Sequence, residues 1–500
     1  MKHLRIAHLQ EDLRESLAQL RQRPDRVRAG RERVEAVLRG GGSYYGINTG
    51  FGALAGKRIP PEQIRDLQRN LLLSHAVGVG ELVPREISRL MLDLKIHSLG
   101  LGFSGVSLGT FERLLEFSER DLVPAVPSRG SLGASGDLAP LAHLALPLIG
   151  LGSFWGGEGG EILPAGPVLE EQGLEPIELE AKDGLSLING TQLMAAYGCW
   201  IAVQCRRLIR AADLVAAMSL EALQGSVRPF DPRIQEVRPH PGQIEVARNV
   251  RQLLIDSEIL ESHRNCGKIQ DPYCLRCVPQ VHGASRDALE YCRRVLETEI
   301  NSATDNPLVF ENGEILSGGN FHGQPLALAL DFAAIALAEL ASISERRTYL
   351  LLGGHDGLPA LLMRETGINS GFMIPQYTAA ALVSENKVLC HPASVDSIPT
   401  SLGQEDHVSM GSIAAIKAHQ VFHNVEMVLA IELFTAAQAL DYRRPLRPGR
   451  GVESAHRFVR NAIPHAERDH YFKEDLNTAW QLVRREGLVE AAEASVGEIA

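Results

Sequence analysis

The segment from Gly130 to His143, GSLGASGDLAPLAH, is rich in small residues. Such a composition indicates that any chemistry here involves the backbone atoms rather than large polar side chains. At its centre is Ala134-Ser135-Gly136, where small side chains allow backbone atoms to approach each other closely. Asp137 and Pro140 then predict the start of a helix, with the aspartate as its cap. A plain structural turn explains the same residues. A serine nucleophile is excluded, because Asp137 stands where the G-x-S-x-G motif requires its last glycine.

A second glycine-rich stretch, Tyr44 to Arg58 (YYGINTGFGALAGKR), has the composition of a phosphate-binding loop. That interpretation fails on spacing, because Gly52 stands one residue too close to Gly56-Lys57. Arg58 also replaces the serine or threonine that would hold magnesium. The residue left with possible chemistry is Tyr45, either as a base or as an ordinary packing residue of the loop.

Further candidates stand in short polar or glycine-containing segments between helical stretches. Each has a structural alternative: an interior histidine, a turn before a helix, or an arginine paired with an internal carboxylate. No metal site is predicted, because Cys274 and Cys277 form a lone C-x-x-C and the adjacent Glu405-Asp406-His407 would point in different directions. The candidates are His75, Asn189, Gln270, Tyr273, Arg276, Phe321 and Glu405.

Together these segments resemble the aromatic amino acid ammonia-lyase family, which comprises lyases of histidine, phenylalanine and tyrosine. The resemblance extends over nearly the whole chain through five separated motifs. It implies a methylidene-imidazolone (MIO) ring, formed when the Gly136 nitrogen attacks the Ala134 carbonyl and Ser135 dehydrates to a methylene. That ring is an electrophile, which no ordinary side chain supplies. No metal and no external cofactor are expected.

The resemblance also implies a role for each candidate residue. A phenol can act as a base only if positive charge or hydrogen bonds stabilise its phenolate. The implied roles are Tyr45 as the base for the β-proton, Asn189 and Arg276 as contacts of the substrate carboxylate (Asn189 also of the MIO), Gln270 and Tyr273 as lining of the MIO pocket, Phe321 as packing beside the substrate, and His75 with Glu405 as contacts of the substrate ring.

The residues expected at the substrate ring are similar to those of the histidine-specific members. Ser74-His75 leaves space and supplies an imidazole, and Glu405 supplies a carboxylate. The resemblance therefore implies elimination of ammonia from L-histidine to give trans-urocanate, a step of histidine degradation. Tyrosine or phenylalanine ammonia-lyase and an MIO aminomutase are the alternatives, with an inactive interaction protein as the non-enzyme alternative. Leu402-Gly403 replaces the family's usual Ala-Asn, which leaves the packing of this loop open.

Composition narrows the partners and the compartment. A net charge of −11 over 500 residues argues against a broad nucleic-acid or anionic-membrane surface. No apolar run approaches the roughly 18 residues of a membrane span, and no signal peptide is expected at the start. Seven cysteines, an odd number, favour reduced thiols and hence the cytoplasm. The expected partner is a small amino acid substrate.

The elements that must position these residues are mainly helical. Long apolar helices expected near 190–223, 284–303, 324–352 and 407–441 need one another to bury their surfaces, which predicts a central helical bundle. A smaller MIO-bearing N-terminal part with short strands precedes it. Polar-faced helices are expected within 10–40, helix from 61 to 101, and a hairpin over 308–316. The predicted regions are 1–188, 189–445 and 446–500. The resemblance implies a homotetramer with shared active sites, in which Tyr45 serves an MIO on another chain.

Overall fold

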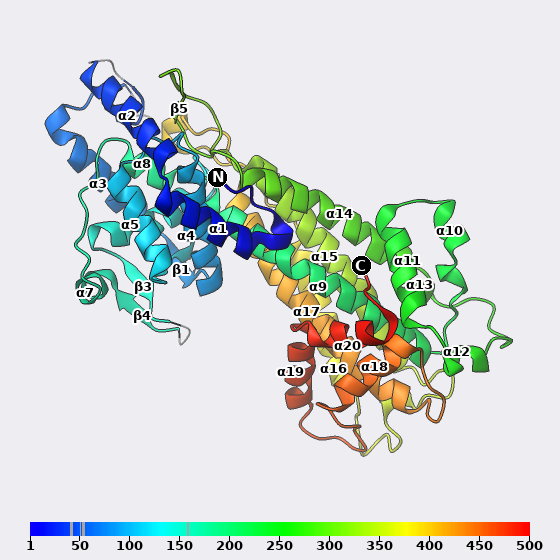
Figure 1. Ribbon diagram of the computed structural model, residues 1–500. Coiled ribbons are helices and arrows are strands. Elements are labelled where there is room, and N and C mark those ends of the chain that lie inside the picture. Colours follow the sequence, from blue (N-terminus) through cyan, green and yellow to red (C-terminus); the bar gives the residue numbers. More distant parts are fainter. Residues whose placement is uncertain (41–43, 51, 53–55, 158–159) are drawn as a thin grey trace. The chain divides into compact units, whose positions relative to one another are not determined.

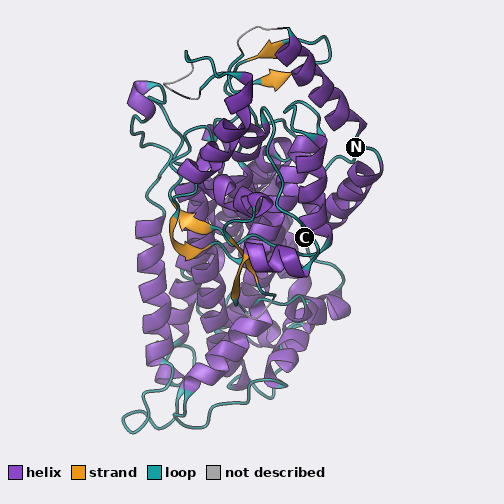
Figure 2. Cartoon of the chain, turned by 90° about the vertical axis from the view of Figure 1, so that its left-hand side faces the viewer, coloured by secondary structure: helices purple, strands orange, loops and turns teal. Residues whose placement is uncertain are grey.

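The computed structural model describes residues 1–40, 44–50, 52, 56–157 and 160–500. It is mainly helical, as predicted, and its described strands form three short antiparallel pairs (Figure 2). The chain makes two compact units, each built from three segments. These segments do not follow the consecutive regions that the sequence suggested, because long helices bring together residues far apart in the chain. Unit 1 comprises 1–200, 293–331 and 392–416, and unit 2 comprises 201–292, 332–391 and 417–500.

Unit 1 contains the short helices of the N-terminal half and all the described strands. Helices α1, α4 and α5 pack against one another (Figure 1). Its helices are α1 (Leu9–Gln22), α2 (Asp25–Arg39), α3 (Ile64–His75), α4 (Arg85–Gly100), α5 (Leu108–Glu119), α6 (Leu138–Ala145), α7 (Ala165–Glu171) and α8 (Asp183–Ile188). Its strands pair as β1 (Val79–Leu82) with β2 (Pro127–Arg129), β3 (Ser153–Trp155) with β4 (Ile162–Pro164), and β5 (Leu308–Val309) with β6 (Ile315–Leu316).

The structure confirms the predicted hairpin and corrects the predicted helix from 61 to 101. The predicted hairpin is confirmed, with Leu308 opposite Leu316 and Gly313 in the turn at φ 84°. Continuous helix from 61 to 101 is wrong, because strand β1 separates α3 from α4. Helix α3 ends at His75, and the segment after it pairs with β2. Within that segment Gly80 takes φ 85°, which a helix does not allow, and Pro84 directly precedes α4.

The four long apolar helices are confirmed as α9 (Gln192–Ala222), α14 (Val278–Glu299), α15 (Gln324–Leu351) and α17 (Gly411–Asp441). Of the five sequence divisions between the two units, four fall inside these four helices, and the fifth lies in a loop between residues 391 and 392. Helix α17 begins later than predicted, so residues 405–407 lie in a loop and not at a helix start. Helix α15 is long and apolar enough to cross a membrane, but 67% of its most apolar window is buried within the protein. It is therefore a core helix.

Within unit 2 the four long helices form the predicted bundle. Their contacts are buried hydrogen bonds and ion pairs that join each helix to the next. Each charge of a buried ion pair compensates the other, because either charge alone would be costly to bury. The contacts are Arg286 (α14) to Asp213 (α9) at 2.6 Å, Ser285 (α14) to the Ala336 carbonyl (α15) at 2.7 Å, Arg347 (α15) to Glu432 (α17) at 2.6 Å, and Ser219 (α9) to Glu432 at 2.6 Å.

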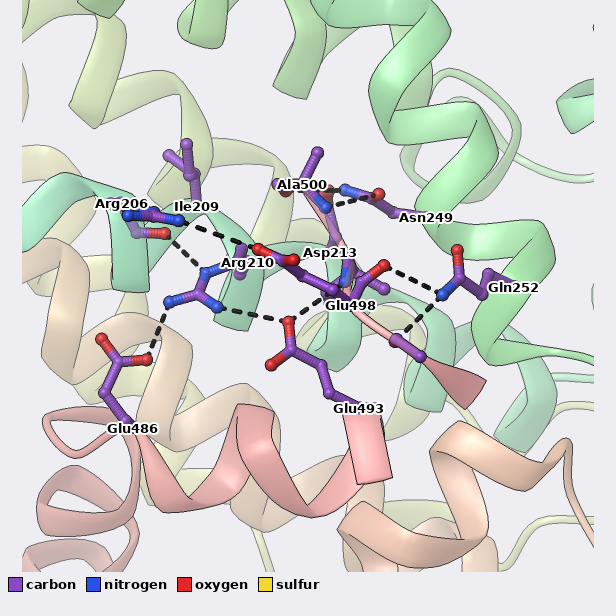
Figure 3. Close-up of polar contacts among 12 residues, drawn as sticks. Arg206, Ile209, Arg210, Asp213, Asn249, Gln252, Glu486, Glu493, Glu498 and Ala500 are labelled. Atoms are coloured by element: carbon purple, nitrogen blue, oxygen red, sulfur yellow. Dashed lines mark hydrogen bonds and ion pairs between the residues drawn. The ribbon is translucent and has the colours of Figure 1, made fainter. Parts of the chain in front are cut away.

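Shorter helices complete unit 2. Figure 3 shows how the last residues are anchored there: Arg210 contacts Glu486 at 2.8 Å and Glu493 at 3.2 Å, and Asn249 exchanges two hydrogen bonds with the backbone of Ala500. The shorter helices are α10 (Pro232–Glu236), α11 (Pro241–Leu253), α12 (Glu258–Ser262), α13 (Tyr273–Arg276), α16 (Met373–Leu389), α18 (Arg450–Arg460), α19 (Phe472–Val483) and α20 (Gly487–Val496).

Candidate active site

Two adjoining cavities in unit 1 gather most of the residues selected from the sequence. One, of about 490 Å³, is lined by Tyr45, Ser135, Asn189, Phe321 and Glu405 among others. The second, of about 650 Å³, shares four of these residues and adds His75, with leucines and two isoleucines forming much of its wall. Residues that are hundreds of positions apart in the chain therefore meet around Ser135.

The Ala134-Ser135-Gly136 loop is compact because its neighbours leave no room for larger residues. Ser135 and Gly136 have φ of 50° and 81°, in the left-handed region that favours glycine. A Cβ at Gly136 would lie 2.0 Å from the Gly190 carbonyl oxygen, and one at Gly133 would lie 2.2 Å from Ser409 Oγ. Ser135 itself is half-buried and lines both cavities.

Asp137 ties this loop to helix α9 and does not cap α6, which corrects the prediction. Its side chain makes no capping hydrogen bond to α6. Instead, Oδ2 accepts from the backbone N–H groups of Leu193 at 2.9 Å and Met194 at 3.1 Å, in the first turn of α9. Its own N–H donates to the Gly190 carbonyl at 2.7 Å. The aspartate therefore fixes the end of the loop against the segment that carries Asn189.

Tyr45 lines both cavities with Ser135 of its own chain. This corrects the expectation that Tyr45 serves an MIO on another chain. The Gly52 backbone N–H donates to the Tyr45 phenolic oxygen at 3.2 Å. A donor at this oxygen stabilises a phenolate. Part of the glycine-rich loop, residues 51 and 53–55, lies outside the described residues.

His75 and Glu405 face the second cavity. Burial lowers the pKa of His75, and the charge of nearby Glu405 acts in the opposite direction. Thr400 Oγ1 donates to Glu405 Oε2 at 2.9 Å, and backbone hydrogen bonds between these two residues close the loop around Leu402-Gly403. The unusual Leu402-Gly403 pair therefore does not prevent the loop from holding its carboxylate.

A model of the family described as "Aromatic amino acid lyase" matches residues 4–461. The chain belongs to this family. The histidine ammonia-lyase of Myxococcus xanthus is 53% identical over 94% of this chain and 92% of its own length. Among solved structures, histidine ammonia-lyase from Trypanosoma cruzi matches with a TM-score of 0.87 and 44% identity, covering 95% of this chain and 89% of that one. Tyrosine aminomutase from Streptomyces globisporus matches with a TM-score of 0.91 and 34% identity, covering 100% and 99%.

Sequence analysis missed a buried polar cluster beneath Asn189 of this aromatic amino acid lyase. Lys182 Nζ pairs with Asp305 Oδ2 at 2.8 Å, and Lys95 Nζ donates to the Asn189 carbonyl at 2.6 Å. Burial lowers the pKa of Lys95 to about 7, although the charge of Asp305 opposes the shift. A single lysine inside an apolar helix and the polar run before Pro307 were the available signals.

Three predicted site residues of this lyase belong to unit 2. Arg276 lies over the Tyr273 ring at 4.4 Å from its centroid and donates to the Asp271 carbonyl at 3.1 Å. No carboxylate among the described residues pairs with Arg276, and Tyr273 is 71% exposed. Gln270 is also exposed. In the part of the chain that is described, no three His, Cys, Asp or Glu side chains are grouped to hold a metal ion.

The buried Asp137 predicts a measurable pH dependence of stability. Burial raises the pKa of Asp137 to about 7, against the two backbone hydrogen bonds that lower it. Between about pH 4 and 7 the folded carboxyl keeps a proton that the unfolded chain has lost, so the free energy of unfolding falls as pH rises. We expect Asp137→Asn to lose this slope, and thus to gain stability relative to wild type between pH 5 and 7.5.

Thermal unfolding at the two pH values measures that difference. Asp12→Asn is the matched control, because Asp12 is also buried but its pKa is lowered by hydrogen bonds from Arg5. It should show no such change between pH 5 and 7.5. An equal slope in wild type and Asp137→Asn would contradict the assignment.

Proposed function

We propose that this protein is a histidine ammonia-lyase, which eliminates ammonia from L-histidine to give trans-urocanate in histidine degradation. The observation that carries the proposal is one cavity system that brings the Ala134-Ser135-Gly136 loop together with Tyr45, His75 and Glu405. Similar curated proteins bear the same name.

The residues of the loop fit the MIO group that the family implies. The crowding around Gly136 and Gly133 accepts only residues without a side chain, and Gly136 N lies 3.4 Å from the Gly133 carbonyl in a tight turn. Ala134, Ser135 and Gly136 would form the ring, and Asp137 and Gly190 would hold it. When formed, the MIO supplies an electrophile that makes the substrate ammonium a better leaving group.

Tyr45 is the proposed base of the elimination. Its phenolate oxygen takes the β-proton, the electrons of that C–H bond form the Cα–Cβ double bond, and the C–N electron pair leaves with ammonia. The Gly52 N–H donates to this oxygen at 3.2 Å and orients it for the transfer. Phe321, in the wall of the 490 Å³ cavity, packs beside the substrate.

His75 and Glu405 are proposed to select the imidazole ring. Because burial lowers the pKa of His75, its imidazole is largely neutral near pH 7 and can accept or donate one hydrogen bond. The Glu405 carboxylate, oriented by Thr400, accepts from a ring N–H. A phenyl ring would leave both groups without partners, and sites of this kind reject such analogues by as much as ~10⁴–10⁵-fold.

The substrate carboxylate is proposed to pair with Arg276, with Gln270 and Tyr273 beside it. Arg276 has no carboxylate partner among the described residues, and a charge-assisted pair of this kind is worth about 1.5–3 kcal/mol. If active sites are shared in a homotetramer, residues other than Tyr45 must reach the site of another copy. Gln270, Tyr273 and Arg276 are the candidates.

An assembly of several copies is supported by exposed apolar side chains in unit 2. Tyr349 of α15 is 61% exposed, and Ile374 and Tyr377 of α16 are 56% and 58% exposed. Large apolar side chains with this much exposure support contact with another copy of the chain. We expect a tetramer in sedimentation experiments, and a fully active monomer would contradict it. None of the seven cysteines, all of which the structure describes, forms a disulfide, which supports a cytoplasmic location.

The test is an ultraviolet assay of the purified protein with L-histidine, L-tyrosine and L-phenylalanine in parallel. Urocanate from histidine alone supports the proposal. Coumarate or cinnamate would retain the elimination chemistry but replace the ring assignment of His75 and Glu405. The absence of product with all three substrates would contradict the proposal. The intact mass of the protein would then show whether the Ala134-Ser135-Gly136 loop had lost two waters.

A further inference from the structure

Lys95 of helix α4 is enclosed by unit 1, and its side chain contacts a backbone carbonyl. It is 2% exposed, and its Nζ donates to the Asn189 carbonyl at 2.6 Å. Among the described residues no carboxylate forms an ion pair with Lys95, because Asp305 of the same cluster pairs with Lys182 at 2.8 Å. Burial of a cation without such a partner is costly, so stability alone does not favour a lysine here.

The peptide group that Lys95 contacts also contacts the Ser135 loop. The Asn189 carbonyl and the Gly190 N–H belong to one peptide group and point in opposite directions, as in any trans peptide. This N–H donates to the Ser135 carbonyl at 3.3 Å, and the Gly190 carbonyl accepts from the Asp137 N–H at 2.7 Å. The Lys95 ammonium, one peptide group and the Ser135 carbonyl are therefore joined by a continuous chain of hydrogen bonds.

A cation at one end of such a chain strengthens the hydrogen bond at the other end. The ammonium draws electron density toward the peptide oxygen, which makes the N–H of the same peptide a stronger donor. The low dielectric constant of a buried place increases the effect of the charge. The backbone is fixed at Gly190, since a Cβ there would lie 2.4 Å from Gln192 Oε1 and its φ is 125°. The charge of Lys95 thus acts on the Ser135 carbonyl oxygen.

The Ser135 carbonyl is the one that dehydration of this residue would conjugate with a methylene. Loss of the hydroxyl leaves a double bond between Cα and Cβ, next to the carbonyl carbon. When a nucleophile forms a bond to Cβ, the electron pair of that double bond moves toward the carbonyl oxygen, where negative charge develops. A hydrogen-bond donor at the place where charge develops lowers the barrier to the addition.

We propose that Lys95 makes the dehydrated Ser135 loop more electrophilic, because its ammonium polarises the Asn189–Gly190 peptide whose N–H donates to the Ser135 carbonyl. This inference rests on the proposed function, since it needs the dehydrated serine. Lys95 lines neither of the two cavities and acts through the peptide, so it is a positioning residue. It gives a buried lysine of the N-terminal half a role in the reactivity of the loop.

Cyanide measures the reactivity of the loop without the amino acid substrate. It has no ring, amine or carboxylate, so the contacts proposed for His75, Glu405 and Arg276 do not affect its addition. Its carbon bonds to the methylene and a solvent proton goes to Cα, so each chain gains the mass of one hydrogen cyanide. At pH 6, below the pKa of about 7 to which burial lowers Lys95, we expect Lys95→Met to add cyanide about 10-fold more slowly than wild type.

Two further measurements separate the charge of Lys95 from a structural role. The intact mass before cyanide is added should lack two waters in wild type and in Lys95→Met, which shows that the loop is correctly folded. The near-ultraviolet absorption band of the conjugated carbonyl should move to shorter wavelength in Lys95→Met, because a weaker hydrogen bond reaches its oxygen. Ser98→Ala is the matched control, since Ser98 is a buried residue of the same helix whose Oγ donates to the Ser302 carbonyl at 3.3 Å. It should change neither the rate nor the band.

The outcomes distinguish this inference from the proposed function. If wild type has lost no water, the proposed function fails and this inference with it. If wild type adds cyanide and Lys95→Met adds it equally fast, only the inference fails. A folded Lys95→Met that keeps both waters would assign Lys95 to formation of the ring and would also overturn the inference. If Lys95→Met does not fold, Lys95→Gln, which retains a polar but uncharged side chain, decides by the same rate: we expect it to be at least about threefold slower than wild type.

Discussion

Ser135→Ala is expected to lower the rate of urocanate formation by on the order of 10³-fold or more, because removal of a reacting group leaves only binding and positioning. Alanine has no β-hydroxyl to lose, so no exocyclic methylene can form at this position. The fold should be retained, since Ser135 is half-buried at the cavity wall and the contacts that fix the loop belong to Asp137. The measurement is the absorbance of urocanate, with thermal unfolding to verify the fold.

The matched control is Ser302→Ala, a serine of unit 1 whose Oγ donates to the Thr298 carbonyl at 2.7 Å outside both cavities. It should keep wild-type turnover. Intact mass provides an independent readout, because wild type should lack two waters relative to its sequence and Ser135→Ala should not. Full activity in Ser135→Ala would remove the MIO from the mechanism.

Glu405→Ala is expected to lower kcat/KM for histidine by about 10–150-fold, which corresponds to the loss of a charged hydrogen bond of ~1.5–3 kcal/mol. The loss should be smaller for the residual turnover of phenylalanine, expected to be as much as ~10⁴–10⁵-fold below that of histidine, because its ring offers no N–H to this carboxylate. Thr400→Val removes the hydrogen bond that orients Glu405 and should give a smaller loss in the same direction. Parallel kinetics with both substrates measure the difference.

Glu311→Ala is the control for this series, because Glu311 is an exposed glutamate in the β5–β6 turn of the same unit. It should leave both substrates unaffected. An unchanged rate with histidine in Glu405→Ala would exclude this residue from the ring pocket. An equal loss with phenylalanine would show that Glu405 serves the reaction or the fold rather than ring choice.

The fold was largely predictable where apolar pattern alone decides the structure. Helices such as α9 and α15 are so apolar that only burial against similar helices satisfies them. The start of α17 and the strand β1 were missed, because glycines and prolines end a helix through backbone geometry that periodicity does not record. The assembly of each unit from three segments depends on long-range packing, which a local pattern does not contain.

The candidate site was predictable where a motif identifies a residue, and it was not where contacts decide a role. Ser135, Tyr45 and Glu405 were selected from the sequence and lie around one cavity system. Sequence predicted that Asp137 caps the helix that follows it. The partner of its carboxylate depends on which helix packs beside it, and in the structure that helix is α9. Lys95 and Asp305 have no motif, since their importance comes from burial beside Asn189.

The cavity lining runs from Tyr45 to Glu405, and unit 1 includes residues 392–416. During synthesis the ribosome must therefore release most of the chain before the last wall of the cavity exists. Until then, apolar surfaces meant for the interior stay open to solvent, and such nascent states depend on chaperones. A substitution in 392–416 that slows docking of this segment will reduce activity in cells through aggregation, even where it spares the chemistry of the folded enzyme.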